Sequence, residues 1–233
     1  MDSIFSSIRL TDIHKDLTRN IVSLRVSEHL FDDLTTDEDA WASAQLLELE
    51  TKSKLFSSDQ PVINRPFEEA EWNNAIGYPF QNSSQSRFSD GTYGVWYGAD
   101  SIETTIYETV HHWQVGLLED AGFNKPGVLI ERRIYLVRCD SALIDLRPAI
   151  KDYPEILHPS DYTATHAIGS KIHREGHPGL VTQSARTKGD TYAIFTPKVL
   201  SNPRHSCFLT YITTTDGVEI QKTPGTAWLK LNK

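Results

Sequence analysis

The chain has 233 residues, of which 39% are hydrophobic and 23% are charged, and its formal net charge at pH 7 is −8. This composition is typical of one large soluble domain, or of one domain with an appendage. The negative charge argues against direct binding of nucleic acid, and it means that any anionic ligand must meet a local basic patch. Two cysteines are too few for a disulfide framework and favour a reducing cytoplasm, and we expect neither a signal peptide nor a membrane span.

Residues 1–57 are predicted to form a helical N-terminal extension. Apolar residues recur at helical spacing in its first half, and a second predicted helix, 34–55, begins with a Thr36 cap and an acidic first turn and ends with basic residues, as the helix dipole favours. We interpret the extension as a helical pair packed on the main domain, and the alternative is an arm that binds a partner. A break rich in Ser, Asp and Pro at 58–70 opens the main domain, 58–233.

Two short segments connect this break to the centre of the domain. Residues 62–64 are predicted to form its first strand. Residues 71–86 are polar and aromatic and are predicted to form a loop. Because structureless connections of this length are uncommon, we expect the loop to be functional.

The segment 87–108 is the centre of the predicted domain. Within it, residues 94–99 form a short aromatic and β-branched run that is typical of a buried strand. A helix then begins at Asp100, which can cap free N–H groups with Glu103 as its capping-box partner. This helix is expected to end near Gly122 and to carry one apolar stripe, formed by Ile102, Ile106, Val110, Trp113 and Leu117. Glu108 lies on the opposite side, which makes it a candidate for a cleft.

The second half of the domain is rich in predicted strands. They are 125–140, a short strand within 141–150, 179–186, 191–197, and a hairpin at 207–223 around Asp216-Gly217. A loop with two prolines, 152–162, and a helix, 165–176, with Gly176 just after its end interrupt this series. Because hairpins rather than regular crossovers join neighbouring strands, we predict an α+β fold with a mixed or mainly antiparallel sheet and flanking helices.

Common metal and phosphate motifs do not explain the polar residues. His173 and His177 are four residues apart and His111 adjoins His112, but the first pair spans a helix end and no cysteine pair or HExxH motif accompanies either, so we expect no metal site. The glycine patterns of the P-loop and of the Rossmann fold are both absent from the sequence. Ser184 is not in a nucleophile elbow and by itself is an ordinary hydrogen-bonding residue.

An ordered set of short motifs points to one family. The set comprises an Arg beside an aromatic residue, a glycine-bearing turn, an aliphatic-Tyr-x-Ala strand, a helix start leading to Glu, and a late Ser-x-Arg. Here these are Arg87-Phe88, Gly91 and Gly94, residues 95–99 with Tyr97, Ser101 to Glu108, and Ser184-Ala185-Arg186. Over roughly residues 61–200 the chain resembles the RES domain family. The family's usual Arg-Trp-Asn is Arg87-Phe88-Ser89 here, and residues 1–57 have no counterpart.

The resemblance implies an ADP-ribosyltransferase-like fold and the activity of an NAD+-degrading toxin from a RES–Xre toxin–antitoxin system. Such a toxin cleaves the nicotinamide–ribose bond and transfers ADP-ribose to water or inorganic phosphate, as an NAD+ glycohydrolase or NAD+ phosphorylase, with NAD+ as substrate and no cofactor. The implied partner is an Xre-type antitoxin, and a homodimer stays open. The implied site residues are Glu108, Arg87 and Ser184 for catalysis and Arg87, Tyr97, Arg65, Ser184 and Arg186 for binding NAD+.

The chemistry of NAD+ suits these residue types. Cleavage releases neutral nicotinamide and leaves an oxocarbenium-like ribose, which a carboxylate such as Glu108 stabilises. The Tyr97 ring can stack on nicotinamide, and the forked guanidinium of Arg87 suits a diphosphate. Each residue also has an ordinary interpretation: Glu108 as a solvated carboxylate, Arg87 as its ion-pair partner and Tyr97 as core. Two functional alternatives stay open, a protein ADP-ribosyltransferase and a non-catalytic interaction module of the same fold.

Overall fold

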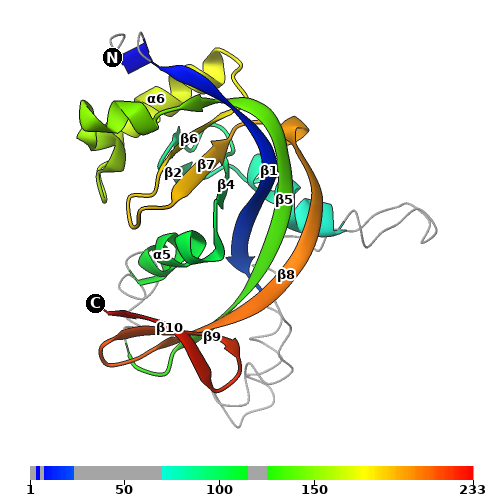
Figure 1. The fold of residues 1–233 in the computed structure, drawn as a ribbon, viewed down its shortest axis with the longest axis vertical. Helices are drawn as coiled ribbons and strands as arrows, with labels where there is room; N and C mark the ends of the chain where they lie inside the picture. Colours follow the sequence, from blue (N-terminus) through cyan, green and yellow to red (C-terminus); the bar gives the residue numbers. More distant parts are fainter. Residues whose placement is uncertain (1–3, 6–7, 24–69, 115–124, 233) are drawn as a thin grey trace, which may run out of the picture.

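The computed structural model describes residues 4–5, 8–23, 70–114 and 125–232 (Figure 1). These residues form an α+β fold around one mixed eight-stranded sheet with the order β1-β4-β7-β6-β5-β8-β9-β10, in which β1 also pairs with β5. Only the β5–β6 pair is parallel among the pairs of this sheet. The strands are β1 (Arg9–Val22), β4 (Trp96–Ala99), β5 (Leu129–Asp145), β6 (Gly179–Gln183), β7 (Asp190–Ile194), β8 (Leu200–Thr213), β9 (Gly217–Thr223) and β10 (Thr226–Asn232).

Short helices and one small hairpin complete the described part of the chain. The hairpin pairs β2 (Gln85–Ser86) with β3 (Ser89–Asp90). The helices are α4 (Tyr78–Gln81), α5 (Ile102–His112), α6 (Thr163–Arg174), a π-helix (Asn73–Gly77) and 3-10 helices at Arg147–Lys151, Pro154–Leu157 and Pro197–Val199. None of the described helices is long and apolar enough to cross a lipid bilayer.

The strand β1 replaces the helix that we predicted for the start of the chain. It pairs antiparallel with β5 along its whole length, from Arg9 opposite Asp145 to Val22 opposite Arg132. Ile13 and Leu17, the buried apolar residues that suggested a helix, are four apart, and this spacing fits a strand of period two equally well. Pairing with a distant strand therefore decided the structure. The rest of the predicted extension and the predicted strand at 62–64 lie outside the described residues, so the domain boundary stays a prediction.

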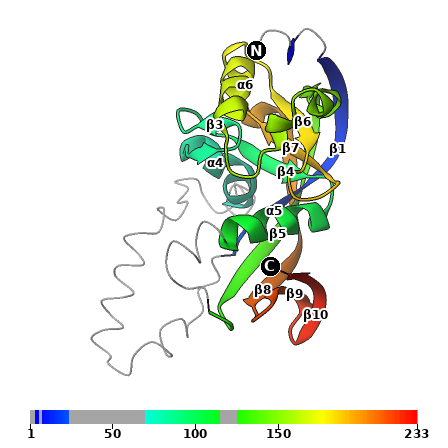
Figure 2. The same cartoon turned by 90° about the vertical axis from the view of Figure 1, so that its left-hand side faces the viewer.

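The long strands curve around a smaller layer. Strands β1, β5 and β8 form an arc, and β4, β7 and β6 lie inside it (Figure 1). Large side chains fill the space between these layers, and Leu17, Trp96 and Tyr192 are each almost fully buried there. Helix α5 lies between the end of the molecule that carries α6 and the end that carries β9 and β10, in the views of Figure 1 and Figure 2. This places α5 beside the inner layer, where its polar side can face a cleft.

The prediction of a loop at 71–86 is wrong, because most of this segment is helical. A π-helix at Asn73–Gly77 leads directly into α4. The buried indole of Trp96 donates a hydrogen bond from Nε1 to the Ala75 carbonyl, 2.7 Å away, which fixes the π-helix against β4. A long-range contact of this kind leaves no local pattern in the sequence.

The central strand and helix are confirmed, with one correction at the helix start. The cap is Ser101 rather than Asp100, because the Ser101 hydroxyl accepts the N–H of Thr104 at 3.1 Å. The apolar stripe packs inward through Ile106, Val110 and Trp113, which are all buried. Residues 115–124 lie outside the described part of the chain, so the predicted helix end near Gly122 is not tested.

The second half follows the predicted order of elements with shifted bounds. Strand β5 continues to Asp145, where two separate strands were predicted, because its far end pairs with β1 and β6. Helix α6, strands β6 and β7, and the β8–β9 hairpin around Asp216-Gly217 are confirmed. At Gly217 an added β-carbon would lie 1.9 Å from the Leu231 carbonyl oxygen, so the backbone of β10, a strand not predicted, requires glycine there.

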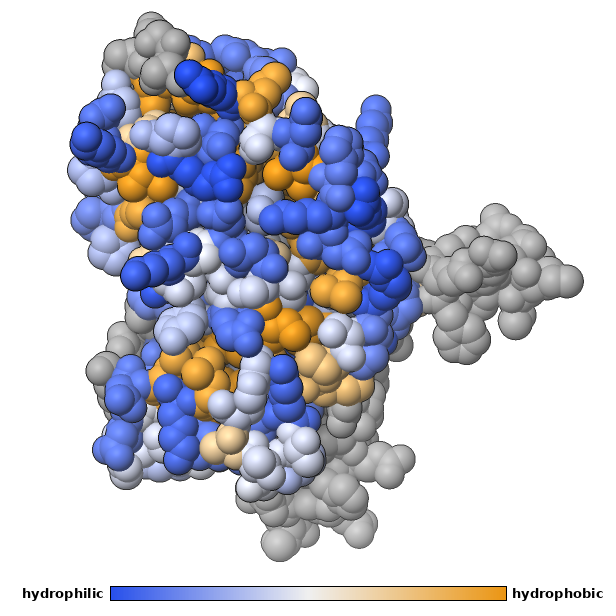
Figure 3. Space-filling model, in the orientation of Figure 1, coloured by the Kyte–Doolittle hydropathy of each residue, from blue (hydrophilic) through white to orange (hydrophobic). Residues whose placement is uncertain are grey.

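The surface is mainly hydrophilic on the face shown in Figure 3. Hydrophobic residues appear on this face as separate patches between the hydrophilic ones. The apolar residues on this face therefore do not form one extensive area.

Candidate active site

A cavity of about 590 Å³ lies between β1, β4, α5 and the β2–β3 hairpin. Its volume is within the range of about 300–1,000 Å³ that is usual for small-molecule sites. Three residues predicted for the site, Arg87, Tyr97 and Glu108, line it. Arg19 and His112, which were not predicted, line it as well. The sequence motifs therefore converge on one cavity, although they come from separate elements.

Glu108 and Ser184 form the central contact of this site. The Ser184 hydroxyl donates a hydrogen bond to Glu108 Oε1 over 2.5 Å, a short distance that is typical of an O–H donor on a carboxylate. The same hydroxyl oxygen accepts the backbone N–H groups of Arg186 and Thr187 at 3.0 and 3.2 Å. Ser184 is 2% exposed, so its hydroxyl is buried and fully bonded. It holds the carboxylate of Glu108 in place.

Tyr97 lines the cavity, and its hydroxyl is bonded to the β2–β3 hairpin. The hydroxyl donates to Ser86 Oγ at 3.0 Å and accepts the N–H of Phe88 at 2.9 Å. Burial raises the pKa of Tyr97 to about 12, so the phenol is neutral at physiological pH. The β2–β3 hairpin thus holds the hydroxyl end of a side chain that lines the cavity.

Arg87 is held by backbone carbonyls rather than by a carboxylate. Its Nη1 donates to the carbonyls of Ile156 and His158, at 3.2 and 2.9 Å, and its guanidinium lies 4.7 Å from the centre of the Tyr162 ring. Burial lowers the pKa of Arg87, although the nearby Tyr162 and Glu108 oppose this shift. The ordinary interpretation, an ion pair between Arg87 and Glu108, is not what the structure has.

Arg19 on β1 is a cleft residue that sequence reasoning missed. Its Nη1 donates to the Tyr97 carbonyl at 2.7 Å, its guanidinium lies 5.4 Å from the Trp96 ring centre, and its Nε is buried without a hydrogen-bond partner. Burial, together with the like charge of Arg132, lowers the pKa of Arg19 to about 10, so it stays charged at neutral pH. In the sequence, the polar run Thr18-Arg19-Asn20 lies within a β-branched segment and could have indicated Arg19 as a site residue. It was overlooked because this segment was predicted to be a helix.

Asn20 connects the cleft to the buried interior through a polar network. Its Nδ2 donates to Thr105 Oγ1 at 3.1 Å and to the Tyr211 hydroxyl at 2.9 Å, and its Oδ1 accepts from Arg132 Nε at 2.8 Å. Arg132 is only 8% exposed, and burial lowers its pKa. These bonds join β1, α5, β5 and β8, which makes the wall of the cleft behind Glu108 rigid.

Arg19 and Arg87 line the cleft, and Arg132 and Arg186 bond to Asn20 and Ser184 beside it. Within the described residues, no ion pair involves Arg19, Arg87, Arg132 or Arg186. Removing a cation from water without pairing it is costly, and an anion bound beside it offsets that cost. The basic patch that the net charge of −8 required for an anionic ligand is therefore present at this cleft.

The remaining predicted residues have different places. Arg186 does not line the cavity: its backbone N–H bonds to Ser184, and its Nη2 donates to the Pro159 carbonyl at 2.5 Å. Arg65 lies outside the described residues. His112 lines the cavity one helical turn after Glu108, and burial lowers its pKa, although Glu108 opposes the shift. In the part of the chain that is described, no group of three or more His, Cys, Asp or Glu could hold a metal ion.

Comparison with known protein families identifies the domain. The model of the RES domain matches residues 63–214, which is more than half of the chain. The chain belongs to the RES domain family. All the described motif residues, from Arg87 to Ser184, fall inside the matched region, so the resemblance inferred from the sequence is confirmed.

One solved structure and the curated proteins complete the comparison for this RES domain. A chain of the crystal structure of the M. tuberculosis MbcT–MbcA toxin–antitoxin complex is 12% identical, with a TM-score of 0.48, and the match covers 88% of this chain and 90% of that chain. No curated protein matches the sequence significantly. The function of this RES domain must therefore be argued from its own cleft.

Proposed function

We propose that this RES domain protein is an NAD+-degrading toxin that cleaves the nicotinamide–ribose bond and transfers ADP-ribose to water or inorganic phosphate. The observation that carries the proposal is the carboxylate of Glu108, which a hydrogen bond from Ser184 holds at the wall of a cavity that Arg19 and Arg87 also line. Within the described part of the chain, neither arginine is paired with a carboxylate. The cavity thus offers a carboxylate to the positive charge that develops on the ribose, and it offers guanidinium groups to the negatively charged diphosphate.

The proposed chemistry assigns one task to each group. When the bond from ribose C1′ to the nicotinamide nitrogen breaks, its electron pair leaves with neutral nicotinamide, and positive charge develops on the ribose. The carboxylate of Glu108 stabilises that charge without reorganising, because Ser184 already fixes it. An oxygen of water or of phosphate then adds to C1′ and completes the transfer, and with water as acceptor a proton passes to solvent.

Substrate binding follows from the charges and the aromatic wall. Arg19 and Arg87 offer guanidinium groups to the diphosphate, whose two negative charges can pair with them. The ring of Tyr97, with its hydroxyl bonded elsewhere, is free to stack on a flat heteroaromatic ring such as nicotinamide. We include an Xre-type antitoxin in the proposal on the resemblance to the family alone.

Incubating the purified chain with NAD+, with and without inorganic phosphate, tests this function. We expect release of nicotinamide together with ADP-ribose in the absence of phosphate, or with ADP-ribose that carries a new phosphate on the same ribose carbon in its presence. Radiolabel that appears on protein favours the alternative of a protein ADP-ribosyltransferase. A folded chain, free of bound partner, that releases no nicotinamide contradicts the proposal and favours a non-catalytic interaction module.

A further inference from the structure

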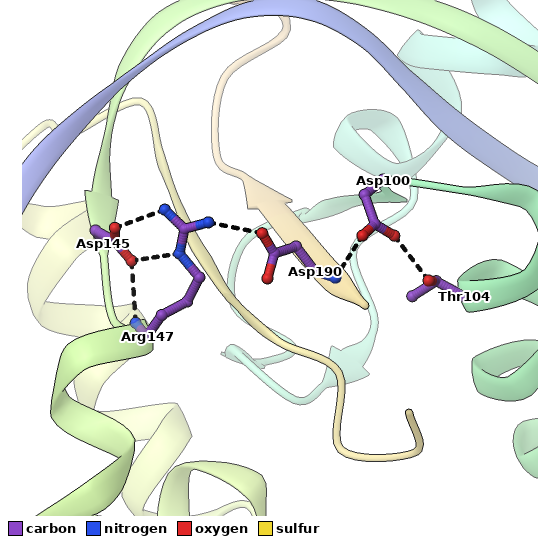
Figure 4. A network of polar contacts seen from close by, with 5 residues as sticks. All are labelled: Asp100, Thr104, Asp145, Arg147 and Asp190. Atoms are coloured by element: carbon purple, nitrogen blue, oxygen red, sulfur yellow. Dashed lines mark hydrogen bonds and ion pairs between the residues drawn. The ribbon is translucent and has the colours of Figure 1, made fainter. Parts of the chain in front are cut away.

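The loop between β6 and β7, residues 184–189, carries Ser184, and its end is bonded to the start of α5. The Ser184 N–H donates to the Gly189 carbonyl at 2.8 Å, which closes the loop on itself. The next residue, Asp190, donates its N–H to Asp100 Oδ2 at 3.0 Å (Figure 4). Its carbonyl accepts the Asp100 N–H at 3.1 Å. Asp100 directly precedes the Ser101 cap of α5. The helix start and the loop end are therefore joined by two reciprocal hydrogen bonds.

Thr104 extends this junction into the helix. Its hydroxyl donates to Asp100 Oδ1 at 2.7 Å, so Asp100 bonds to the loop through one oxygen and to the helix through the other (Figure 4). A β-carbon added at Gly189 would lie 2.0 Å from Thr104 Oγ1, so the loop backbone passes directly against this side chain. We call Asp100, Thr104 and Gly189 the clamp.

The loop end is also anchored on its far side. Arg147 Nη1 donates to Asp190 Oδ2 at 2.6 Å, and Arg147 bonds to both oxygens of Asp145, at 2.8 and 2.7 Å (Figure 4). The bonds to Asp145 raise the pKa of Arg147. Burial alone would raise the pKa of Asp145, but its bonds with Arg147 outweigh burial and lower it. The ion pairs of Arg147 fix Asp190 to the end of β5.

The clamp adjoins the elements that carry Glu108 and Ser184. Glu108 follows Thr104 by four positions, which places it on the same face of α5 one turn later. Ser184 lies at the other end of the loop that the clamp holds. We propose that the clamp of Asp100, Thr104 and Gly189 positions the pair formed by Glu108 and Ser184, so that the carboxylate faces the cleft at a fixed distance from the bound ribose. The catalytic part of this inference rests on the proposed function.

Thr104→Val and Gly189→Ala test the clamp in two different ways. The first substitution keeps the shape of the side chain and removes its hydrogen bond to Asp100; the second keeps every hydrogen-bonding group and forces the loop away from Thr104. In both variants we expect kcat for NAD+ to fall by about 10-fold to 100-fold, the scale for misplacing a catalytic group by an ångström, while KM stays nearly unchanged. Thr210→Val is the matched control, because it removes a similar hydroxyl bond, to Glu131 on β5, away from the cleft.

A double substitution separates positioning from general loss of stability. If the clamp acts through Ser184, adding Thr104→Val to Ser184→Ala should cause little further loss of kcat, because the pair it positions is already broken. If Thr104→Val lowers kcat by the same factor in the parent and in the Ser184→Ala variant, the inference is overturned. So would a folded Thr104→Val variant with the kcat of the parent.

Amide hydrogen exchange tests the same inference without catalysis. The N–H groups of Arg186 and Thr187 bond to Ser184 Oγ, so their exchange reports whether Ser184 holds its place. We expect faster exchange of both in Thr104→Val and no change in Thr210→Val; unchanged exchange in Thr104→Val would refute the clamp. A parent chain that fails to consume NAD+ contradicts the proposed function, and the exchange experiment still decides on the clamp.

Discussion

Replacing Glu108 by glutamine is the sharpest perturbation of the proposed site. Glutamine keeps the size of the side chain and an oxygen that can accept the Ser184 hydroxyl, now 2.5 Å from Glu108 Oε1. The hydrogen bond changes from one with a charged acceptor, worth about 1.5–3 kcal/mol, to a neutral one of about 0.5–1.5 kcal/mol, so we expect unfolding free energy to fall by about 1 kcal/mol. The fold should survive, because domains are typically stable by about 5–15 kcal/mol.

The effect on turnover should be much larger than the effect on stability. A neutral amide cannot balance the positive charge that develops on the ribose, and removing one preorganised electrostatic contact typically lowers kcat by about 10²–10³, or about 2.7–4 kcal/mol. Affinity for NAD+ should change little, because the charge of Glu108 matters most in the transition state.

Melting temperature, NAD+ affinity and turnover should be measured on the same preparation of the Glu108→Gln variant. Glu103→Gln is the matched control: it removes a carboxylate from the same helix at an exposed position outside the cavity. It should lower stability by about 0.3–1 kcal/mol through the helix dipole and leave turnover unchanged. A folded Glu108→Gln variant that consumes NAD+ at the parent rate would refute the role given to this carboxylate.

Three further predictions follow from the cleft. Arg87→Ala should weaken NAD+ binding by about 1.5–3 kcal/mol, the value of a charge-assisted hydrogen bond, when measured by titration in the Glu108→Gln background; equal weakening by Arg138→Ala, a surface control paired with Asp140, would contradict a specific contact. A chelator should leave turnover unchanged, and activity lost to the chelator and restored by zinc or magnesium would count against a metal-free site. Because the pKa of Tyr97 is raised to about 12, neutral Tyr97 stabilises the fold fully below pH 10, and this stabilisation is lost as pH rises through about 12. Unfolding free energy measured across that range should therefore fall less in Tyr97→Phe than in the parent, and parallel curves would refute the assignment.

The sequence by itself determined the elements whose signals are local. The run at 94–99 and the apolar stripe of α5 specify a strand followed by a helix, because their periods differ and turn residues separate them. The Asp216-Gly217 turn likewise specifies the β8–β9 hairpin. The motif order around Tyr97 and Glu108 was sufficient to indicate the RES domain family, which the family comparison confirms.

Only the tertiary structure decided how these elements meet. Arg9–Val22 is a strand because β5 pairs with it along its whole length, and that pairing brings Arg19 into the cleft. Asp100, an expected cap, instead bonds across to Asp190 and leaves capping to its neighbour. The bond between Ser184 and Glu108 joins residues 76 positions apart, and a separation of that size has no periodicity to reveal it. Local patterns encode each side chain's own element, whereas the distance between two side chains depends on every strand and loop packed between them.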